Sequence, residues 1–289
     1  PPPPPPGWRP RDGDARMSVL LHLSDLHFGA HDQRVCEAVS RLTARLGVGV
    51  LVVSGDLTQR ATPEQFEQAH AFLSSLPIPH RLVVPGNHDV PLFAWWERLA
   101  GQAYRRYARW WGDELEGTCH ADGFHVMAVN TTRWWRHERG SLSPQQIDAI
   151  AQRLGATRKD DWRIVVSHHP LAAAHEEDRR HRPHRADRAL TRWSAAGADL
   201  LLSGHAHEPG LVEPMKGLWS AQAGTAVSVR LRANAPNSLV TLERVPSAAG
   251  DRHQRLLTRW DYVPDAQEFL PVEKHDLSVA PSGCLRRRR

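Results

Sequence analysis

The stretch LLHLSDLH at residues 20–27 places two polar side chains, Asp25 and His27, directly after a short apolar run. An apolar run of this length, Val19 to Leu23, is typical of a buried strand. The same arrangement recurs several times along the chain, so the polar residues that follow each run are the first candidates for a functional site.

Helical patterns separate the first predicted strands. Residues 35–46 carry apolar side chains four, three and four positions apart, and Gly47 stands where such a helix would end. Residues 62–65, Thr-Pro-Glu-Gln, supply a cap, a proline at the first helical position and a glutamine at the third, which predicts a second helix. Apolar runs at residues 48–53 and 81–84 follow these helices as strands. Strands that alternate with helices predict an α/β architecture.

The second half of the chain continues the pattern. Residues 92–110 predict an aromatic helix, which we expect to pack in the core, although its tryptophans could instead line a substrate site. Residues 143–146 repeat the capping pattern before another helix. Further strands are predicted at residues 124–129, 164–166, 200–202, 218–221, 239–242 and 256–262. This number of strands is too large for one short sheet and predicts two stacked sheets.

Three parts of the chain differ in composition. Residues 1–16 form a proline-rich extension that cannot pack a core, so we expect it to be disordered. Residues 17–264 contain the predicted elements and form the expected catalytic domain. Residues 265–289 are expected to be a tail with a basic end, Arg286 to Arg289. The polar stretch 175–188 is interpreted as a solvated surface loop, with a cap that binds phosphate as the alternative.

Composition restricts the function classes. A formal net charge of +5 allows anionic partners such as nucleic acid, although the basic end alone accounts for most of it. No apolar stretch is long enough for a membrane span, so we expect no membrane partner. The 3 cysteines contain no C-x-x-C pair and form no disulfide framework, which favours a cytoplasmic location.

Five polar clusters each follow a predicted buried strand: Ser24-Asp25-Leu26-His27, Gly55-Asp56, Gly86-Asn87-His88-Asp89, Ser167-His168-His169-Pro170 and Gly204-His205-Ala206-His207. The carboxyl ends of strands in an α/β sheet are where ligands bind, so these clusters can converge on one point. Asp56 lies 31 residues after Asp25 and 31 residues before Asn87, the length of one strand-helix-strand unit.

The residue types in these clusters favour a metal site. Asp25 and His27 are two positions apart, and so are His205 and His207, so each pair can project in one direction and chelate an ion. Carboxylate, amide oxygen and imidazole together suit iron, manganese, zinc or cobalt. Asp-Leu-His and Gly-Asp alone are common in unrelated proteins, and Gly-Asn-His-Asp and Gly-His-x-His are more specific. The joint occurrence of the motifs in this order favours a shared metal centre.

On these motifs the chain resembles the calcineurin-like metallophosphoesterase superfamily. Its pattern runs D-x-H, G-D, G-N-H-[DE], a histidine and G-H-x-H, and every element stands in order between Asp25 and His207. Within the superfamily the chain is similar to the bacterial cyclic-nucleotide phosphodiesterase-like branch, on residues 21–27, 55–58 and 223–226 and on the later Arg230, Arg232 and Asn237. The resemblance covers roughly residues 17–262.

The resemblance implies a fold, a ligand set and a reaction. The fold is a β-sandwich of two mixed sheets flanked by helices, in four layers α/β/β/α. The implied roles are Asp25, His27 and His207 on one metal, Asn87, His168 and His205 on the other, Asp56 bridging both, His88 as the catalytic histidine, Asp89 as the carboxylate that orients it, and His169 beside the metals or facing the substrate.

The implied activity is hydrolysis of phosphodiester bonds in a small phosphate ester, with a cyclic nucleotide as the candidate substrate. Two metal ions would neutralise the phosphate and activate a bridging water, with His88 assisting. Two alternatives stay open: a phosphomonoesterase or nuclease on the same site, and a non-enzymatic scaffold. Scaffolds of this kind tend to lose metal ligands, whereas all seven positions are present here.

Overall fold

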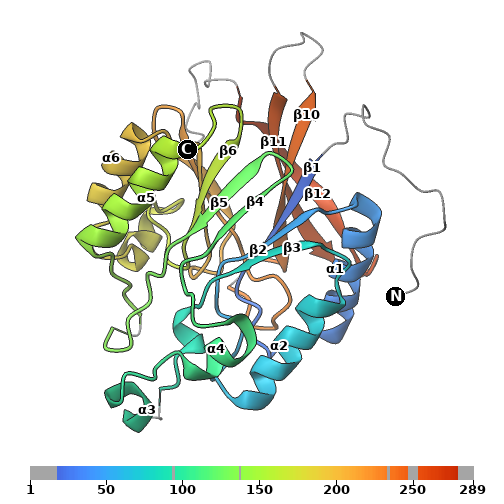
Figure 1. Cartoon of the computed structure of the whole chain (residues 1–289). Coiled ribbons are helices and arrows are strands. Elements are labelled where there is room, and N and C mark those ends of the chain that lie inside the picture. The colour runs from blue at the N-terminus through green and yellow to red at the C-terminus, as the bar shows by residue number, and fades with distance from the viewer. Residues whose placement is uncertain (1–17, 93–94, 137, 233–234, 247–252, 279–289) are drawn as a thin grey trace, which may run out of the picture.

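Two six-stranded sheets packed face to face form the centre of the molecule (Figure 1). The computed structural model describes residues 18–92, 95–136, 138–232, 235–246 and 253–278. The proline-rich residues 1–16 and the basic end 286–289 lie outside this described part.

The first sheet has the strand order β12-β11-β10-β1-β2-β3. Its strands are β1 (Ser18–Leu23), β2 (Val50–Val53), β3 (His80–Val83), β10 (Ser238–Pro246), β11 (His253–Val263) and β12 (Glu268–Asp276). Strands β1, β2 and β3 are parallel to one another, whereas β10, β11 and β12 continue the sheet as an antiparallel meander.

The second sheet has the strand order β4-β5-β6-β7-β9-β8. Its strands are β4 (Thr118–Ala121), β5 (Phe124–Ala128), β6 (Trp162–Val166), β7 (Leu200–Ser203), β8 (Gly210–Met215) and β9 (Leu218–Gln222). The four central strands are parallel and the two edge strands are antiparallel, so both sheets are mixed.

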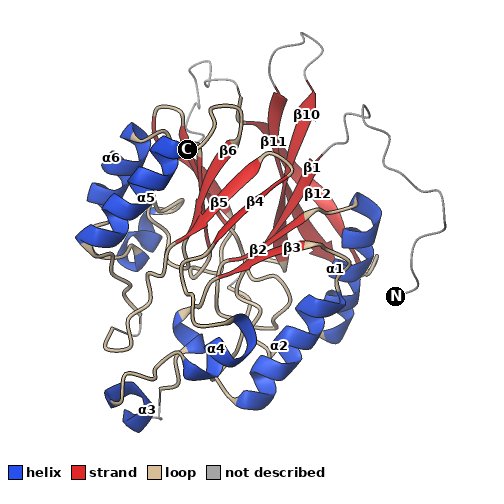
Figure 2. Ribbon diagram, viewed as in Figure 1, coloured by secondary structure: helices blue, strands red, loops and turns tan. Residues whose placement is uncertain are grey.

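Helices cover both outer faces of the sandwich (Figure 2). They are α1 (Gln33–Leu46), α2 (Pro63–Ser75), α3 (Trp95–Leu99), α4 (Arg105–Trp111), α5 (Pro144–Ala156) and α6 (Ala186–Ala195), with short 3₁₀ turns at Asn87–Asp89 and Glu176–His181. Helices α1 and α2 pack on the first sheet and α5 and α6 on the second, which confirms the four-layer arrangement. Within the described part of the chain, no helix is long and apolar enough to cross a membrane.

The predicted helix caps are present. Ser143 Oγ accepts a hydrogen bond from the Gln146 backbone N–H at 3.1 Å, and Gln146 Oε1 accepts one from the Ser143 N–H at 2.8 Å. The Thr62 hydroxyl accepts from the Gln65 N–H at the start of α2, while the Gln65 side chain accepts from the Arg60 N–H, and Gly47 ends α1 in the left-handed conformation. These contacts satisfy backbone groups that the helix ends leave without partners, which is why the capping sequences located these helices correctly.

The expectation of one aromatic helix over residues 92–110 is wrong. The structure has two short helices, α3 and α4, separated near Gly101, which adopts a φ of 73°. Trp96 and Leu99 are 69% and 64% exposed, so core packing holds for Tyr107, which is fully buried, but not for the first half of the segment. Glycine in the left-handed conformation ends a helix whatever the spacing of the apolar residues around it.

The interpretation of residues 265–289 as a tail is wrong for their first half. Strand β12 pairs with β11 over its whole length, and Phe269 is 1% exposed in the core beneath α1. An edge strand with one solvated face needs few apolar side chains, so its sequence resembles a tail. The polar stretch 175–188 likewise contains a 3₁₀ turn and the start of α6 instead of loop alone.

Strand β12 can be tested by truncating its buried aromatic residue. Phe269→Ala should lower the free energy of unfolding by about 3–5 kcal/mol, because the change leaves a cavity in a packed core. Leu270→Ala is the matched control, since Leu270 is 40% exposed on the same strand and should change stability far less. Urea denaturation measures both, and equal losses in the two variants would contradict the assignment of β12 to the core.

Candidate metal centre

Polar side chains from five loops meet at one end of the two sheets. The loops follow β1, β2 and β3 of the first sheet and β6 and β7 of the second, all parallel strands that end on the same side of the sandwich. Figure 2 shows loops gathered at this end, below the strands. The topology therefore brings the five clusters together, as the sequence predicts.

The backbone turns sharply at the residues that enter this site. Five of them adopt positive φ angles of 46–71°, a conformation that costs a residue other than glycine about 1–3 kcal/mol. They are Asp25, His27, Asp56, His205 and His207. Such turns redirect the chain immediately after each strand and aim the side chains inward.

Two glycines allow the loops to approach each other. A Cβ on Gly86 would collide with the backbone N and the carboxylate of Asp56, and a Cβ on Gly204 would collide with Ser24 and Asp25. Any larger residue at either position would push the loops apart. The close approach explains why glycine precedes both Asn87 and His205.

The first ligand group contains Asp25, His27, His207 and Asp56. The Nε2 atoms of His27 and His207 are 3.0 Å apart. Asp25 Oδ1 lies 3.3 Å from His207 Nε2 and 3.9 Å from His27 Nε2, and Asp56 Oδ2 lies 3.8 Å from His27 Nε2. All four ligand atoms lie within 4.8 Å of one another.

The second ligand group contains Asn87, His168, His205 and again Asp56. Asn87 Oδ1 lies 2.9 Å from both His168 Nε2 and His205 Nδ1. Asp56 Oδ1 lies 3.4 Å from His168 Nε2. Asp56 thus offers one carboxylate oxygen to each group, which is the arrangement expected of a bridging ligand.

The donor atoms of the two ligand groups are better suited to binding metal ions than to hydrogen-bonding with one another. Asp25 Oδ1 is buried and accepts no hydrogen bond within the described residues, although an ionised oxygen in the protein interior normally has donors. A cation at the centre of the group would satisfy it. The residues and their clustering indicate a dimetal site.

Burial and neighbouring charges hold these side chains in protonation states that can bind cations. Burial lowers the pKa of His27 to about 4 and that of His205 well below its usual range, so both rings are neutral near pH 7. Burial opposes ionisation of Asp25, but His207 and its other histidine neighbours hold the Asp25 pKa below the ordinary range. His168 Nδ1 donates to the Ser54 carbonyl at 2.8 Å, which leaves the lone pair on Nε2 facing the site.

His88 stands beside the first ligand group, 4.9 Å from His27 between ring centroids. Its Nδ1 lies 2.9 Å from the carbonyl oxygen of Gln59, and its Nε2 lies 3.4 Å from Arg230 Nη1. Gln59 Oε1 also accepts from Arg230 at 3.1 Å. Sequence reasoning did not assign Gln59 any role, because a backbone carbonyl leaves no signal in the residue type.

Asp89 makes a different set of contacts from those expected. Its carboxylate accepts hydrogen bonds from the backbone N–H groups of Gly86, Leu57 and Thr58 at 2.8, 3.1 and 2.9 Å, and one from the Thr58 hydroxyl. The 3₁₀ turn directs this side chain back under the loop after β2, so the Gln59 carbonyl holds His88 instead. Burial and the charge of Asp56 raise the pKa of Asp89 to about 6.

His169 is buried behind the second ligand group. Its ring lies 4.4 Å from that of His205 between centroids, and its Nδ1 lies 2.8 Å from the Thr131 hydroxyl. The side chain is fully buried, so the expectation that it faces the substrate does not match its position. Its ring instead packs against that of His205.

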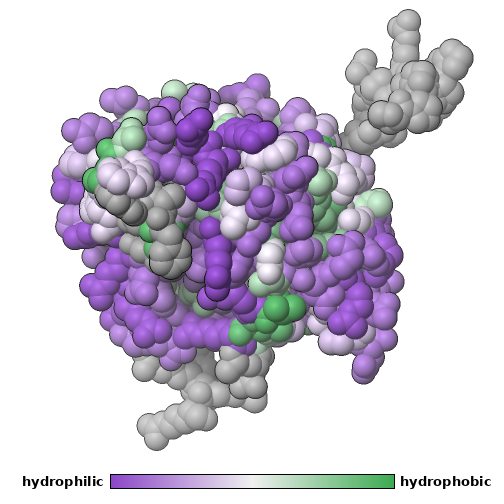
Figure 3. Space-filling model, turned by 90° about the horizontal axis from the view of Figure 1, so that it is seen from below, coloured by the Kyte–Doolittle hydropathy of each residue, from purple (hydrophilic) through white to green (hydrophobic). Residues whose placement is uncertain are grey.

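A basic hollow of about 350 Å³ opens over the site. Its lining includes His205 and His207 from the two ligand groups and three arginines, Arg180, Arg230 and Arg232, here called the rim arginines. The face seen in Figure 3 is largely hydrophilic, as expected for a surface that receives a charged ligand.

The rim arginines differ in their partners. Arg232 is paired with Asp178 at 2.7 Å and Glu208 at 2.9 Å, so its charge is already compensated. Within the described residues, neither Arg180 nor Arg230 has a carboxylate within 4.0 Å, and Arg230 is the one of the two that lies beside His88, with Nη1 3.4 Å from His88 Nε2. His181, from the polar stretch 175–188, reaches 3.2 Å from His205 Nε2, so part of that stretch does lie over the site.

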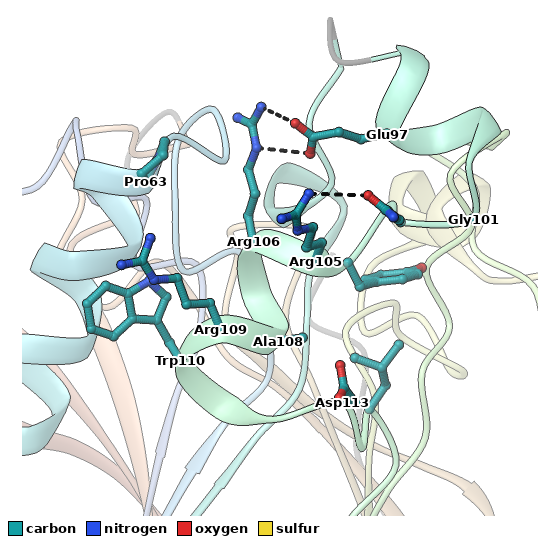
Figure 4. A pocket seen from close by; sticks show the side chains of 12 residues that line it. Pro63, Glu97, Gly101, Arg105, Arg106, Ala108, Arg109, Trp110 and Asp113 are labelled. Atoms are coloured by element: carbon teal, nitrogen blue, oxygen red, sulfur yellow. Dashed lines mark hydrogen bonds and ion pairs between the residues drawn. The ribbon is translucent and has the colours of Figure 1, made fainter.

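A larger hollow of about 930 Å³ lies beside α4, outside the ligand groups (Figure 4). Its wall includes Arg106, which forms a two-point ion pair with Glu97, and Arg109, whose guanidinium lies 5.8 Å from the ring of Trp110. None of the metal-ligand candidates lines it, so its size does not make it the reaction site.

Comparison with known proteins agrees with this geometry. A model of the calcineurin-like phosphoesterase family matches residues 18–209. A probable cyclic nucleotide phosphodiesterase from Synechococcus sp. is 27% identical over 167 residues, which cover 55% of this chain and 60% of that protein. A cAMP/cGMP dual specificity phosphodiesterase from Mycobacterium tuberculosis is 26% identical, over 53% of this chain and 49% of that protein. The match therefore spans about half the length of these relatives.

The fold is also that of a solved phosphatase. Purple acid phosphatase from yellow lupin superposes with a TM-score of 0.66 at 11% identity, covering 94% of this chain and 57% of that one. At such low identity the similarity concerns the fold alone.

The contacts of Asp89 predict that its main effect is on stability. Asp89→Ala should lower the free energy of unfolding by at least about 3 kcal/mol, because three buried backbone donors lose their acceptor at about 1–3 kcal/mol each. Asp113→Ala, which removes an exposed carboxylate, should stay within about 0.5 kcal/mol of the wild type. Chemical denaturation compares them, and a fully stable Asp89→Ala variant would show that these bonds are dispensable.

Proposed function

Since the chain belongs to the calcineurin-like phosphoesterase family, whose model matches residues 18–209, we propose that it is a dimetal hydrolase of phosphodiester bonds. The observation that carries the proposal is the pair of ligand groups that share Asp56. A small phosphate ester is the proposed partner, with cyclic nucleotides as the substrate class, because two relatives bear that description.

The metal-binding roles follow the two ligand groups. One ion would be held by Asp25, His27 and His207, the other by Asn87, His168 and His205, with Asp56 between them. Iron, manganese, zinc and cobalt all accept this mixture of oxygen and nitrogen donors. Two such ions, when bound, supply Lewis acidity at the phosphate and an activated water.

His88 is proposed as the catalytic histidine. A carbonyl oxygen can only accept, so the contact with Gln59 makes Nδ1 the donor and assigns the exchangeable site to Nε2. In the protonated ring, Nε2–H can donate a hydrogen bond to a phosphoryl oxygen or a proton to the leaving oxygen. Asp89 acts indirectly, because its carboxylate holds the loop after β2 against the turn that carries His88.

Arg230 is proposed to bind the phosphate of the substrate. Arg230 lines the hollow, and its Nη1 lies 3.4 Å from His88 Nε2. A diester carries one negative charge, which Arg230, together with the metals and the neighbouring Arg180, can balance. The hollow of about 350 Å³ lies at the small end of the range for small-molecule sites, which favours a mononucleotide over a polymer.

Two variants test the assignment of the centre. Asp56→Asn should lose bound metal and most of the activity, because it removes the charge that both ions share. His88→Ala should retain metal but lose about 10²–10⁴-fold in kcat, the usual contribution of a general acid. Elemental analysis and turnover of bis-p-nitrophenyl phosphate measure both, with circular dichroism as the folding control. Wild-type turnover in metal-loaded Asp56→Asn would defeat the proposal.

A substrate panel tests the reaction class. With added manganese, bis-p-nitrophenyl phosphate and cyclic AMP should be hydrolysed with a higher kcat/KM than p-nitrophenyl phosphate or single-stranded DNA. Preference for p-nitrophenyl phosphate would make the protein a phosphomonoesterase, and preference for DNA a nuclease. Inactivity on all four, with two metals bound, would favour the scaffold alternative.

A further inference from the structure

A second group of metal-ligand residues lies at the opposite end of the second sheet. His120 and His125 are cross-strand partners in the β4–β5 hairpin, so their side chains share one face of the sheet. Asp161 stands two residues before Arg163, the partner of His125 on β6, and its side chain points to that face as well. This is the amino end of β5 and β6, whereas the dimetal site lies beyond the carboxyl ends.

The three side chains converge on one point. His120 Nε2 lies 3.1 Å from Asp161 Oδ2, and the rings of His120 and His125 stack with centroids 5.1 Å apart and planes at 27°. Ligand atoms of all three residues lie within 4.8 Å of one another. Two imidazoles and one carboxylate at this separation can bind one ion together.

The carboxylate lacks a satisfactory partner. Asp161 is 8% exposed, and its Oδ2 accepts no hydrogen bond of good geometry among the described residues, although His120 Nε2 is close. An ionised oxygen held this way in the interior is costly unless a cation meets it. His125 is half-buried, and burial lowers its pKa, which leaves a neutral ring able to bind metal.

The positive charges around the group lower its affinity for a cation but do not abolish it. Arg255 and Arg163 both pair with Asp199 at 3.0 Å, so its single carboxylate offsets one of the two positive charges, and Arg255 also donates to the Asp161 backbone carbonyl at 3.3 Å. Arg244 hydrogen-bonds to the carbonyls of Asp122 and Asp160 and contacts His253, and its positive charge disfavours a cation nearby. The site should therefore bind more weakly than the dimetal centre and exchange its ion readily.

We propose that His120, His125 and Asp161 form a third metal site, which takes a nitrogen-preferring divalent ion such as zinc. Imidazole ligands select zinc, nickel or copper over magnesium and calcium, which prefer oxygen donors. A bound ion would connect the edge hairpin β4–β5 to the start of β6. Because His120 is exposed, the ion can enter from solvent and keep open positions for water.

Zinc counting on the full chain tests this site. After equilibrium dialysis at a fixed free zinc concentration, the wild type should hold about one zinc ion per chain more than His120→Ala or His125→Ala. The two variants should keep wild-type phosphoesterase turnover, since neither residue contacts the dimetal centre, and this turnover also shows that they are folded. His80→Ala, which removes an exposed histidine at the start of β3, should bind as much zinc as the wild type.

Two results would overturn the proposal. Equal zinc content in the wild type and both cluster variants would mean that Asp161 serves only as an ion-pair partner for His120. An equal loss of zinc in the His80→Ala control would assign the extra ion to scattered surface histidines.

Discussion

The buried carboxylate of Asp56 is the constraint around which the metal-ligand end of the molecule is organised. It is 1% exposed and faces His27 from the first sheet and His168 from the second. A carboxylate in such a place is costly unless positive charge balances it, and the proposed metal ions would provide that charge. The two sheets must therefore dock in one fixed relation, because a shift of either would separate Asp56 from half of its partners.

That relation is maintained largely by the backbone. The loops after β2 and β3 are in contact at Gly86, which has no side chain to separate them. The Asp89 carboxylate links the two loops by accepting hydrogen bonds from three backbone N–H groups. The positive φ of Asp25 and Asp56 is a local cost that these contacts help to offset. Stability and activity at this end of the sandwich consequently depend on many of the same atoms.

The two ends of the sandwich contrast in how they present similar donor atoms. At the carboxyl ends, loops enclose the ligands and a rim arginine, Arg230, faces the opening. At the amino end, His120 and His125 sit on a hairpin, half open to solvent, with Asp161 behind them. Enclosure lets the first site tune the protonation of its groups by burial, whereas the second must rely on the direct attraction between its donors and an ion.

The sequence by itself determined the order of most of the elements and the candidate ligand residues. Apolar runs marked most strands, the capping residues Thr62 and Ser143 marked helix starts, and the polar residues after each run marked the site, because these are local signals carried by neighbouring residues. Edge strands such as β12 were not predicted, because a half-solvated strand has too few apolar side chains to be distinguished from a tail.

Tertiary structure alone decided which atoms meet. It placed His88 Nδ1 against the carbonyl oxygen of Gln59, directed the Asp89 carboxylate toward backbone donors, and buried His169 behind His205. It also brought Asp161 to His120, 41 positions away in the sequence. The physical reason is that hydrogen-bond geometry and burial depend on how separate segments pack, and a residue type records neither its distant neighbours nor the direction of its side chain.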